Sequence, residues 1–176
     1  LDALPEAPDH LALFTPAETS VHVLRQGATA GARSGTLYAA GFGEGGDEEG
    51  RHLAAALRTV LDDTGLTMVG PNCMGVACGK SNFCTIPDET LQELAESPVA
   101  VVAQSGAICA SINRAINDLG LKIGYFASCG GQVGCKISDC TAGRNGQAGI
   151  SVSNYCTIRD CTVVENIGIG ASGIRM

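Results

Sequence analysis

The hydrophobic pattern of the chain changes at about residue 127, and this change limits what its 176 residues can fold into. Before that point, short apolar runs alternate with segments of helical spacing, a pattern typical of βαβ units around a parallel sheet. After it, helical spacing disappears, and short apolar segments separated by Asn and Gly remain. The sequence therefore predicts an α/β part followed by a part made of β segments.

The first part contains clear strand and helix signals. Strands are expected at residues 10–14, 35–40, 66–69, 98–103 and 121–127, and helices at 18–30, 48–64 and 105–119. Residues 75–97 are expected to form a loop followed by a short helix at 88–95. The helix at 48–64 is amphipathic, and five side chains are predicted to point inward: Leu53, Ala56, Leu57, Val60 and Leu61. The segment 98–103 is apolar throughout, which favours a buried strand.

The last part contains a repeat of 21 residues. When 135–155 is placed above 156–176, eight positions are identical: Cys135/Cys156, Ile137/Ile158, Asp139/Asp160, Cys140/Cys161, Thr141/Thr162, Asn145/Asn166, Gly149/Gly170 and Ser151/Ser172. A coil of this length is what a right-handed parallel β-helix stacks. We therefore expect inward ladders of Ile137 over Ile158 and Cys140 over Cys161, and a turn ladder of Asn145 over Asn166.

Charge and cysteine content exclude several kinds of partner. The formal net charge of −7 argues against nucleic acid or an anionic membrane surface as a partner. No apolar run reaches the roughly 18–20 residues that a membrane span needs, and no secretion signal is visible, so a cytoplasmic location is expected. The nine cysteines are odd in number and include no CxxC pair, so we predict neither a disulfide framework nor a metal site.

Three short motifs have both a functional and a purely structural interpretation. The Gly41–Gly46 segment fits GxGxxG, but the acidic residues in and after it would repel a pyrophosphate, so a tight turn that presents Glu44 is favoured over nucleotide binding. A strand is joined to a helix by Gln104, Ser105, Gly106 and Ala107. This segment is either an anion site or simply an N-cap. A strand end is followed by Gly70, Pro71, Asn72 and Cys73. This loop either binds a ligand, since open α/β sheets place ligands there, or is a plain turn.

Five stretches, taken in order, resemble the NDP-forming acid–CoA ligases, relatives of the succinyl-CoA synthetase α chain. They are Pro5–Asp9, Thr15–Ala17, Ala40–Glu44, Gly70–Gly75 and Val101–Ala107. The resemblance covers about residues 1–139. It implies that 1–95 is the C-terminal half of a Rossmann-like CoA-binding domain and 96–135 the start of a flavodoxin-like domain, followed by β-helix-like coils at 136–176.

The resemblance also implies roles for residues. Enzymes of this family make acyl-CoA and ADP or GDP reversibly, through an acyl phosphate and a phosphorylated His. By analogy, Gln104–Ala107 would receive phosphate, while Pro16, Glu44 and the Gly70–Cys73 loop would lie near CoA or the acyl group. Nucleotide would bind only to a separate ATP-grasp domain or subunit. The family's glycine-rich CoA phosphate loop has no counterpart in this sequence. Its catalytic His has none either, since His10, His22 and His52 do not match its position.

These observations lead to one principal interpretation and two alternatives. The chain is expected to be an incomplete acid–CoA ligase segment with weak CoA or phosphate binding and no turnover alone. The first alternative is a chimeric or structural protein without catalytic function. The second is a β-helix module that binds carbohydrate or a partner chain. Exposed sheet edges predict either a homo-oligomer or poor solubility.

Overall fold

The computed structural model describes residues 3–88 and 95–131 and six short strands after them. The chain divides into two compact units, Leu1–Val133 and Gly134–Met176. Each unit is described by itself below. Among the described helices, none is long and apolar enough to cross a membrane.

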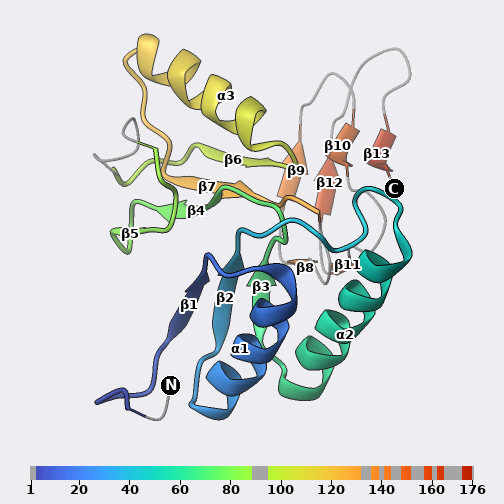
Figure 1. Ribbon diagram of the computed structural model, residues 1–176. Coiled ribbons are helices and arrows are strands. Elements are labelled where there is room, and N and C mark those ends of the chain that lie inside the picture. The colour runs from blue at the N-terminus through green and yellow to red at the C-terminus, as the bar shows by residue number, and fades with distance from the viewer. Residues whose placement is uncertain are drawn as a thin grey trace. The chain divides into compact units, whose positions relative to one another are not determined.

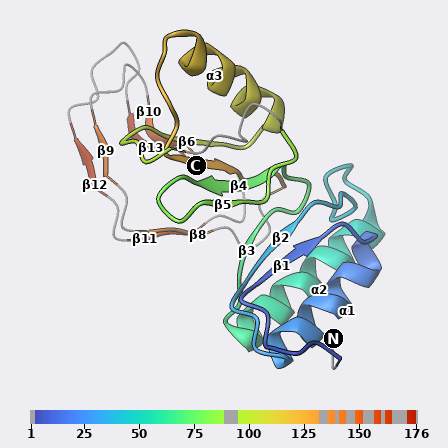
Figure 2. The same ribbon diagram turned by 90° about the vertical axis from the view of Figure 1, so that its left-hand side faces the viewer.

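The first sheet of the larger unit is entirely parallel. It contains the strands β1 (His10–Leu13), β2 (Ser34–Leu37) and β3 (Thr67–Val69) in the order β1-β2-β3. The helix α1 (Ala17–Thr29) connects β1 to β2, and α2 (Glu48–Thr64) connects β2 to β3. Both helices lie on the same face of the sheet (Figures 1 and 2). The expected α/β class with a parallel sheet is confirmed.

The helical face of this sheet carries the first hydrophobic core. Leu24 of α1 and Leu57 of α2 are fully buried against Leu37 of β2. Of the five side chains predicted to point inward from α2, Ala56 is exposed, and Ala54 packs against the core in its place. At 3.6 residues per turn, Ala56 lies about 100° around the helix from Leu57 and Ala54 only about 60°. Ala56 therefore falls outside the buried stripe.

The second sheet has the order β5-β4-β7-β6. Its strands are β4 (Gly75–Cys78), β5 (Phe83–Cys84), β6 (Ala100–Ala103) and β7 (Tyr125–Ser128), and α3 (Gly106–Asp118) connects β6 to β7. Strand β4 runs antiparallel to both of its neighbours, while β6 and β7 are parallel. Of the strands that precede residue 95, β1, β2 and β3 thus belong to the first sheet, and β4 and β5 belong to the second. The predicted domain boundary after residue 95 stays a prediction.

Two expectations for the strands of this sheet are wrong: the loop from residue 75 and the complete burial of β6. The loop expected from residue 75 is instead the hairpin β4–β5, which turns at Asn82 with a φ of 50°. Most of the helix expected at 88–95 lies outside the described residues, but Asp88 and Ala95 at its ends are not helical. Strand β6 is not buried throughout, because β6 is an edge strand and α3 packs on one face: Val101 is buried, whereas Val102 is 55% exposed.

The smaller unit contains three parallel strand pairs. They join β8 (Lys136–Ser138) to β11 (Thr157–Arg159), β9 (Thr141–Gly143) to β12 (Thr162–Val164), and β10 (Ala148–Ser151) to β13 (Ser172–Arg175). The first two pairs keep the predicted interval of 21 residues, including Ile137 opposite Ile158.

The third pair corrects the predicted register. Ser172 pairs with Ala148 rather than with Ser151, an interval of 24 residues. This shift places Ile150 opposite Ile174, whereas the 21-residue alignment would place Ile150 opposite Ala171 and Ile174 opposite Ser153. The predicted ladders of Cys140 over Cys161 and Asn145 over Asn166 lie outside the described residues. That the pairs form coils of a β-helix stays a prediction.

Replacing Leu24 by Ala should destabilise the larger unit by about 2–5 kcal/mol, because a fully buried side chain would leave a cavity between α1 and β2. The control is Leu119→Ala, since Leu119 is 76% exposed and its loss should change stability by about 0.5 kcal/mol or less. Urea unfolding of both variants measures the difference. Equal stability of the two variants would contradict the assignment of this core.

Candidate functional site

The residues predicted to bind ligands all follow the carboxyl ends of strands. Pro16 comes after β1, Glu44 after β2, the Gly70–Cys73 loop after β3, and the Gln104–Ala107 segment after β6. Because parallel strands end at the same edge of a sheet, this placement gathers loops into the region where open α/β sheets bind ligands.

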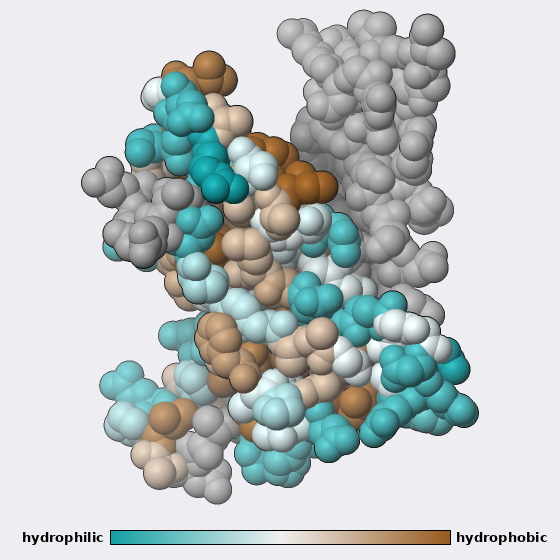
Figure 3. Space-filling view, turned by 45° about the horizontal axis from the view of Figure 1, so that its top comes forward, coloured by the Kyte–Doolittle hydropathy of each residue, from teal (hydrophilic) through white to brown (hydrophobic). Residues whose placement is uncertain are grey.

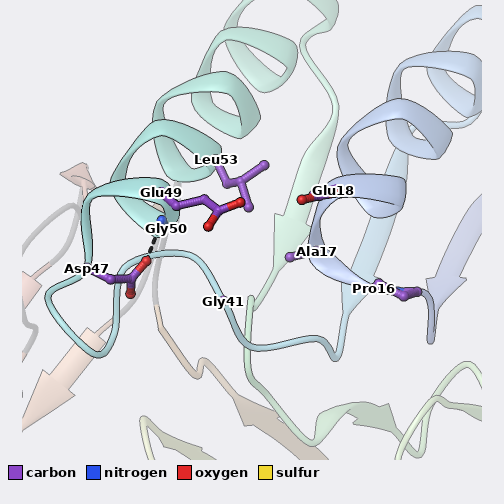
Figure 4. A pocket seen from close by; sticks show the side chains of 8 residues that line it. All are labelled: Pro16, Ala17, Glu18, Gly41, Asp47, Glu49, Gly50 and Leu53. Carbon is purple, nitrogen blue, oxygen red and sulfur yellow. Dashed lines mark hydrogen bonds between the residues drawn. The ribbon is translucent and has the colours of Figure 1, made fainter.

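A pocket of about 440 Å³ lies between the first turns of α1 and α2 (Figure 4). Pro16 is the predicted site residue that lines it. The remaining lining residues come from the start of α1, from the loop after β2 and from α2: Ala17, Glu18, Gly41, Asp47, Glu49, Gly50 and Leu53. Figure 4 shows Glu18 and Glu49 facing each other across the gap between the two helices. Since both are acidic, the pocket disfavours a pyrophosphate, as the sequence indicated.

Asp47 fixes the start of α2. Its carboxylate is the N-cap and accepts a hydrogen bond of 2.6 Å from the Gly50 amide. Glu48 and Glu49 occupy the first turn and interact favourably with the helix dipole. These three acidic residues compensate the positive end of the helix dipole, so this helix N-terminus disfavours a further anion.

Glu44 turns back onto its own loop. Its carboxylate accepts hydrogen bonds from the Phe42 amide at 2.7 Å and the Gly41 amide at 3.0 Å. The tight turn predicted for this segment is present, and the Glu44 side chain closes it. The side chain itself is exposed to solvent.

The Gly70–Cys73 loop is held against β2 by its backbone. The Asn72 amide donates to the Ala39 carbonyl at 2.9 Å, and the Gly70–Pro71 peptide bond is cis. Gly70 has a φ of 102°, and a Cβ at this position would overlap the Leu37 carbonyl, so only glycine fits. The backbone of this loop is therefore fixed by close packing.

Cys73 is not an activated nucleophile. Its thiol donates to the Leu37 carbonyl at 3.3 Å, and burial raises its pKa to about 11. Because the thiolate is the reactive form, Cys73 is inert near neutral pH. By contrast, hydrogen bonding by Ser81 lowers the pKa of the half-buried Cys78 thiol on β4.

Residues 128–131, at the end of β7 and just after it, bring two of the predicted groups together. The Gly131 amide donates to the Pro71 carbonyl at 2.6 Å, and the Gly130 amide donates to the Gln104 carbonyl at 3.1 Å. The Ser128 hydroxyl accepts from the Met74 amide at 3.1 Å. The loop after β3 and the segment after β6 thus meet at a junction that we define as Gly70–Met74, Gln104–Ala107 and Ser128–Gly131.

Sequence reasoning did not assign Ser128, Gly130 or Gly131 to the site. The available signal was a pair of glycines shortly after a strand, since such glycines often mark a close approach of two backbones. A Cβ on Gly130 would overlap the Pro71 and Asn72 carbonyls, and Gly106 is similarly crowded by the Met74 side chain. The junction is therefore built from backbone groups and depends on small residues.

Ser105 caps α3 as predicted, because its hydroxyl accepts from the Ile108 amide at 3.5 Å. The first turn of α3 contains no acidic residue, unlike those of α1 and α2. Its helix dipole is thus uncompensated in the first turn and favours an anion there. Among the described residues, no group of three or more His, Cys, Asp and Glu side chains could hold a metal ion.

The comparisons with known proteins agree with this architecture. No protein-family profile matches the chain. It is 29% identical over 143 residues to a trans-feruloyl-CoA synthase from an unknown prokaryotic organism, covering 77% of this chain and 20% of that protein. The chain thus spans about a fifth of the curated relative that it matches.

Solved structures show the same fold. The protein PH0766 of Pyrococcus horikoshii superposes with a TM-score of 0.64 at 24% identity, over 74% of this chain and 29% of that protein. The dinucleotide-forming acetyl-coenzyme A synthetase 1 of Ca. Korarchaeum cryptofilum gives a TM-score of 0.67 at 20% identity, over 76% and 28% of the respective chains. The same enzyme with phosphate and ADP gives the same values. At this identity, the likeness establishes the fold.

Alkylation should distinguish the two thiols. At pH 8, iodoacetamide should modify Cys78 at least about tenfold faster than Cys73, because the lowered pKa of Cys78 gives it the larger thiolate fraction. Peptide mapping by mass spectrometry measures each site separately. Cys109, whose pKa is raised by burial, is the internal control and should also react slowly. Equal rates at Cys73 and Cys78 would contradict the burial of Cys73.

Gly130→Ala should destabilise the larger unit more than Gly120→Ala. Both glycines have positive φ, 61° and 73°, so each substitution carries a backbone cost of about 1–2 kcal/mol. Only at Gly130 would the new methyl group also overlap carbonyl groups, adding about 1–3 kcal/mol, whereas Gly120 has nothing within 4 Å. Thermal unfolding of both variants tests this. If both lose the same stability, the close approach at the junction is wrong.

Proposed function

We infer that this chain is a segment of an NDP-forming acid–CoA ligase that binds CoA weakly and does not complete the reaction alone. The observation that carries this proposal is the junction, where the Gly131–Pro71 and Gly130–Gln104 hydrogen bonds join the predicted coenzyme loop to the predicted phosphate segment. The sequence similarity to a feruloyl-CoA synthase and the fold shared with an acetyl-coenzyme A synthetase support it.

In this proposal, the two sides of the junction have different ligands. CoA contacts the Gly70–Cys73 loop, with Pro16 and Glu44 at the same edge of the first sheet. Phosphate binds at Gln104–Ala107, because α3 is the described helix whose first turn lacks acidic residues. Residues 1–95 would then belong to a CoA-binding domain and 96–135 to the start of a flavodoxin-like domain, with β-helix-like coils at 136–176.

The histidines of the larger unit are engaged elsewhere. The two ring nitrogens of His10 lie 2.8 Å from the Ser34 hydroxyl and 3.0 Å from the Thr36 hydroxyl. His22 bonds Gln26 on α1, and His52 lies 3.9 Å from Glu48 on α2. In this proposal, a phosphorylated His comes from another part of the enzyme, and nucleotide binds to an ATP-grasp domain or subunit.

Isothermal titration with CoA tests the binding proposal. We expect saturable but weak binding, and we expect Asn72→Gly to weaken it by roughly two- to tenfold, the equivalent of one lost hydrogen bond. Glycine retains the φ of 52° at this position, so the substitution removes only the side chain. Asn82→Gly is the matched control: Asn82 has a φ of 50° in the β4–β5 turn and should leave CoA binding unchanged.

Three outcomes would overturn the proposal. If CoA does not bind at millimolar concentration, or if the two Asn variants weaken binding equally, the assignment of the Gly70–Cys73 loop is wrong. If the isolated chain turns over acid, CoA and ATP to an acyl-CoA, its assignment as a non-catalytic segment is wrong.

A further inference from the structure

The Glu44 carboxylate occupies a position that an external anion could take. Two successive amides, those of Gly41 and Phe42, point at one carboxylate oxygen, at 3.0 and 2.7 Å. Successive backbone N–H groups that converge in this way form an anion-binding concavity, called a nest. In this chain the anion is supplied by the loop itself, three residues after Gly41.

The nest lies beside the junction and is open to solvent. The other carboxylate oxygen of Glu44 lies 3.2 Å from where a Cβ on Gly131 would be, so glycine permits this approach. Gly131 in turn donates to the Pro71 carbonyl. Glu44 and Gly41 are both exposed, while the Phe42 side chain is 5% exposed and anchors the loop in the core. The Glu44 carboxylate covers both amides, so a ligand would reach them where this exposed side chain moves away.

The charge around the nest favours a singly charged ligand. Asp47, Glu48 and Glu49 follow within five positions of Glu44, and Glu49 lines the neighbouring pocket. Each of these carboxylates repels an anion, and the repulsion grows with the charge of the ligand. A carboxylate carries one negative charge and matches the group that already occupies the nest, whereas phosphate carries more at neutral pH.

We propose that the Gly41 and Phe42 amides form a carboxylate-binding nest that Glu44 closes from within, and that a substrate acid binds by displacing the Glu44 side chain. As a statement about substrate, this rests on the proposed ligase function. The nest itself can be tested without CoA or turnover, so its failure and the failure of the ligase assignment are distinguishable.

Acetate is the probe, and the amide resonances of Gly41 and Phe42 are the readout. We expect acetate to shift both resonances in Glu44→Ala at concentrations at least about tenfold lower than in the unchanged chain, because the tethered carboxylate competes at high effective concentration. Glu44→Gln should fall between the two, since its neutral side chain still reaches the amides and competes less. If Glu44→Ala does not fold, Glu44→Gln carries the test. Its response to acetate is then compared with that of the unchanged chain, and the expected gain is smaller than tenfold.

The matched control is Glu48→Ala, which removes the same charge from an exposed residue of α2 that lies outside the nest. It should leave the response of the two amides to acetate as it is in the unchanged chain. The proposal is wrong if a folded Glu44 variant shows no gain in acetate response, or if Glu48→Ala shows the same gain. Stronger binding of inorganic phosphate than of acetate by Glu44→Ala would overturn the assignment to carboxylates.

Discussion

The contact between the Gly131 amide and the Pro71 carbonyl is the interaction on which the candidate site depends. At 2.6 Å, it joins a loop that follows the first sheet to a loop that follows the second. Two backbones approach this closely only where no Cβ intervenes, and Gly130 and Gly131 provide that space. The junction is thus set by main-chain packing.

The fold was predictable where local signals are strong. The three described helices were expected within one or two residues of their observed bounds, because a capping residue or a terminal glycine marks each one, such as Ser105 before α3 and Gly65 after α2. Strands β4 and β5 were not predicted. Strand β4 pairs with β7, which lies far later in the chain, and β5 pairs with β4.

The site was predictable in its parts but not in its assembly. Each loop follows a strand, and so the Gly70–Cys73 and Gln104–Ala107 segments were expected from strand ends alone. The glycine pair at 130–131 indicates only that two backbones approach closely there. Which loops Ser128–Gly131 joins depends on how the two sheets meet. The exposure of apolar side chains also depends on how the elements pack. Val102, Ile108 and Leu119 are apolar yet exposed, and Figure 3 shows hydrophobic colour on the surface over α3. Hydropathy alone therefore predicts their burial wrongly.

Electrostatics then divides the site. The helices that follow β1 and β2 begin with acidic residues, Glu18 in α1 and Glu48 and Glu49 in α2, which compensate the positive ends of these helices. The first turn of α3 has no such residue, so it retains its attraction for anions. A ligand with several negative charges is therefore better accommodated beside α3, and a ligand with one charge can be tolerated beside α2. Backbone packing brings the two environments together, and the placement of acidic residues makes them different.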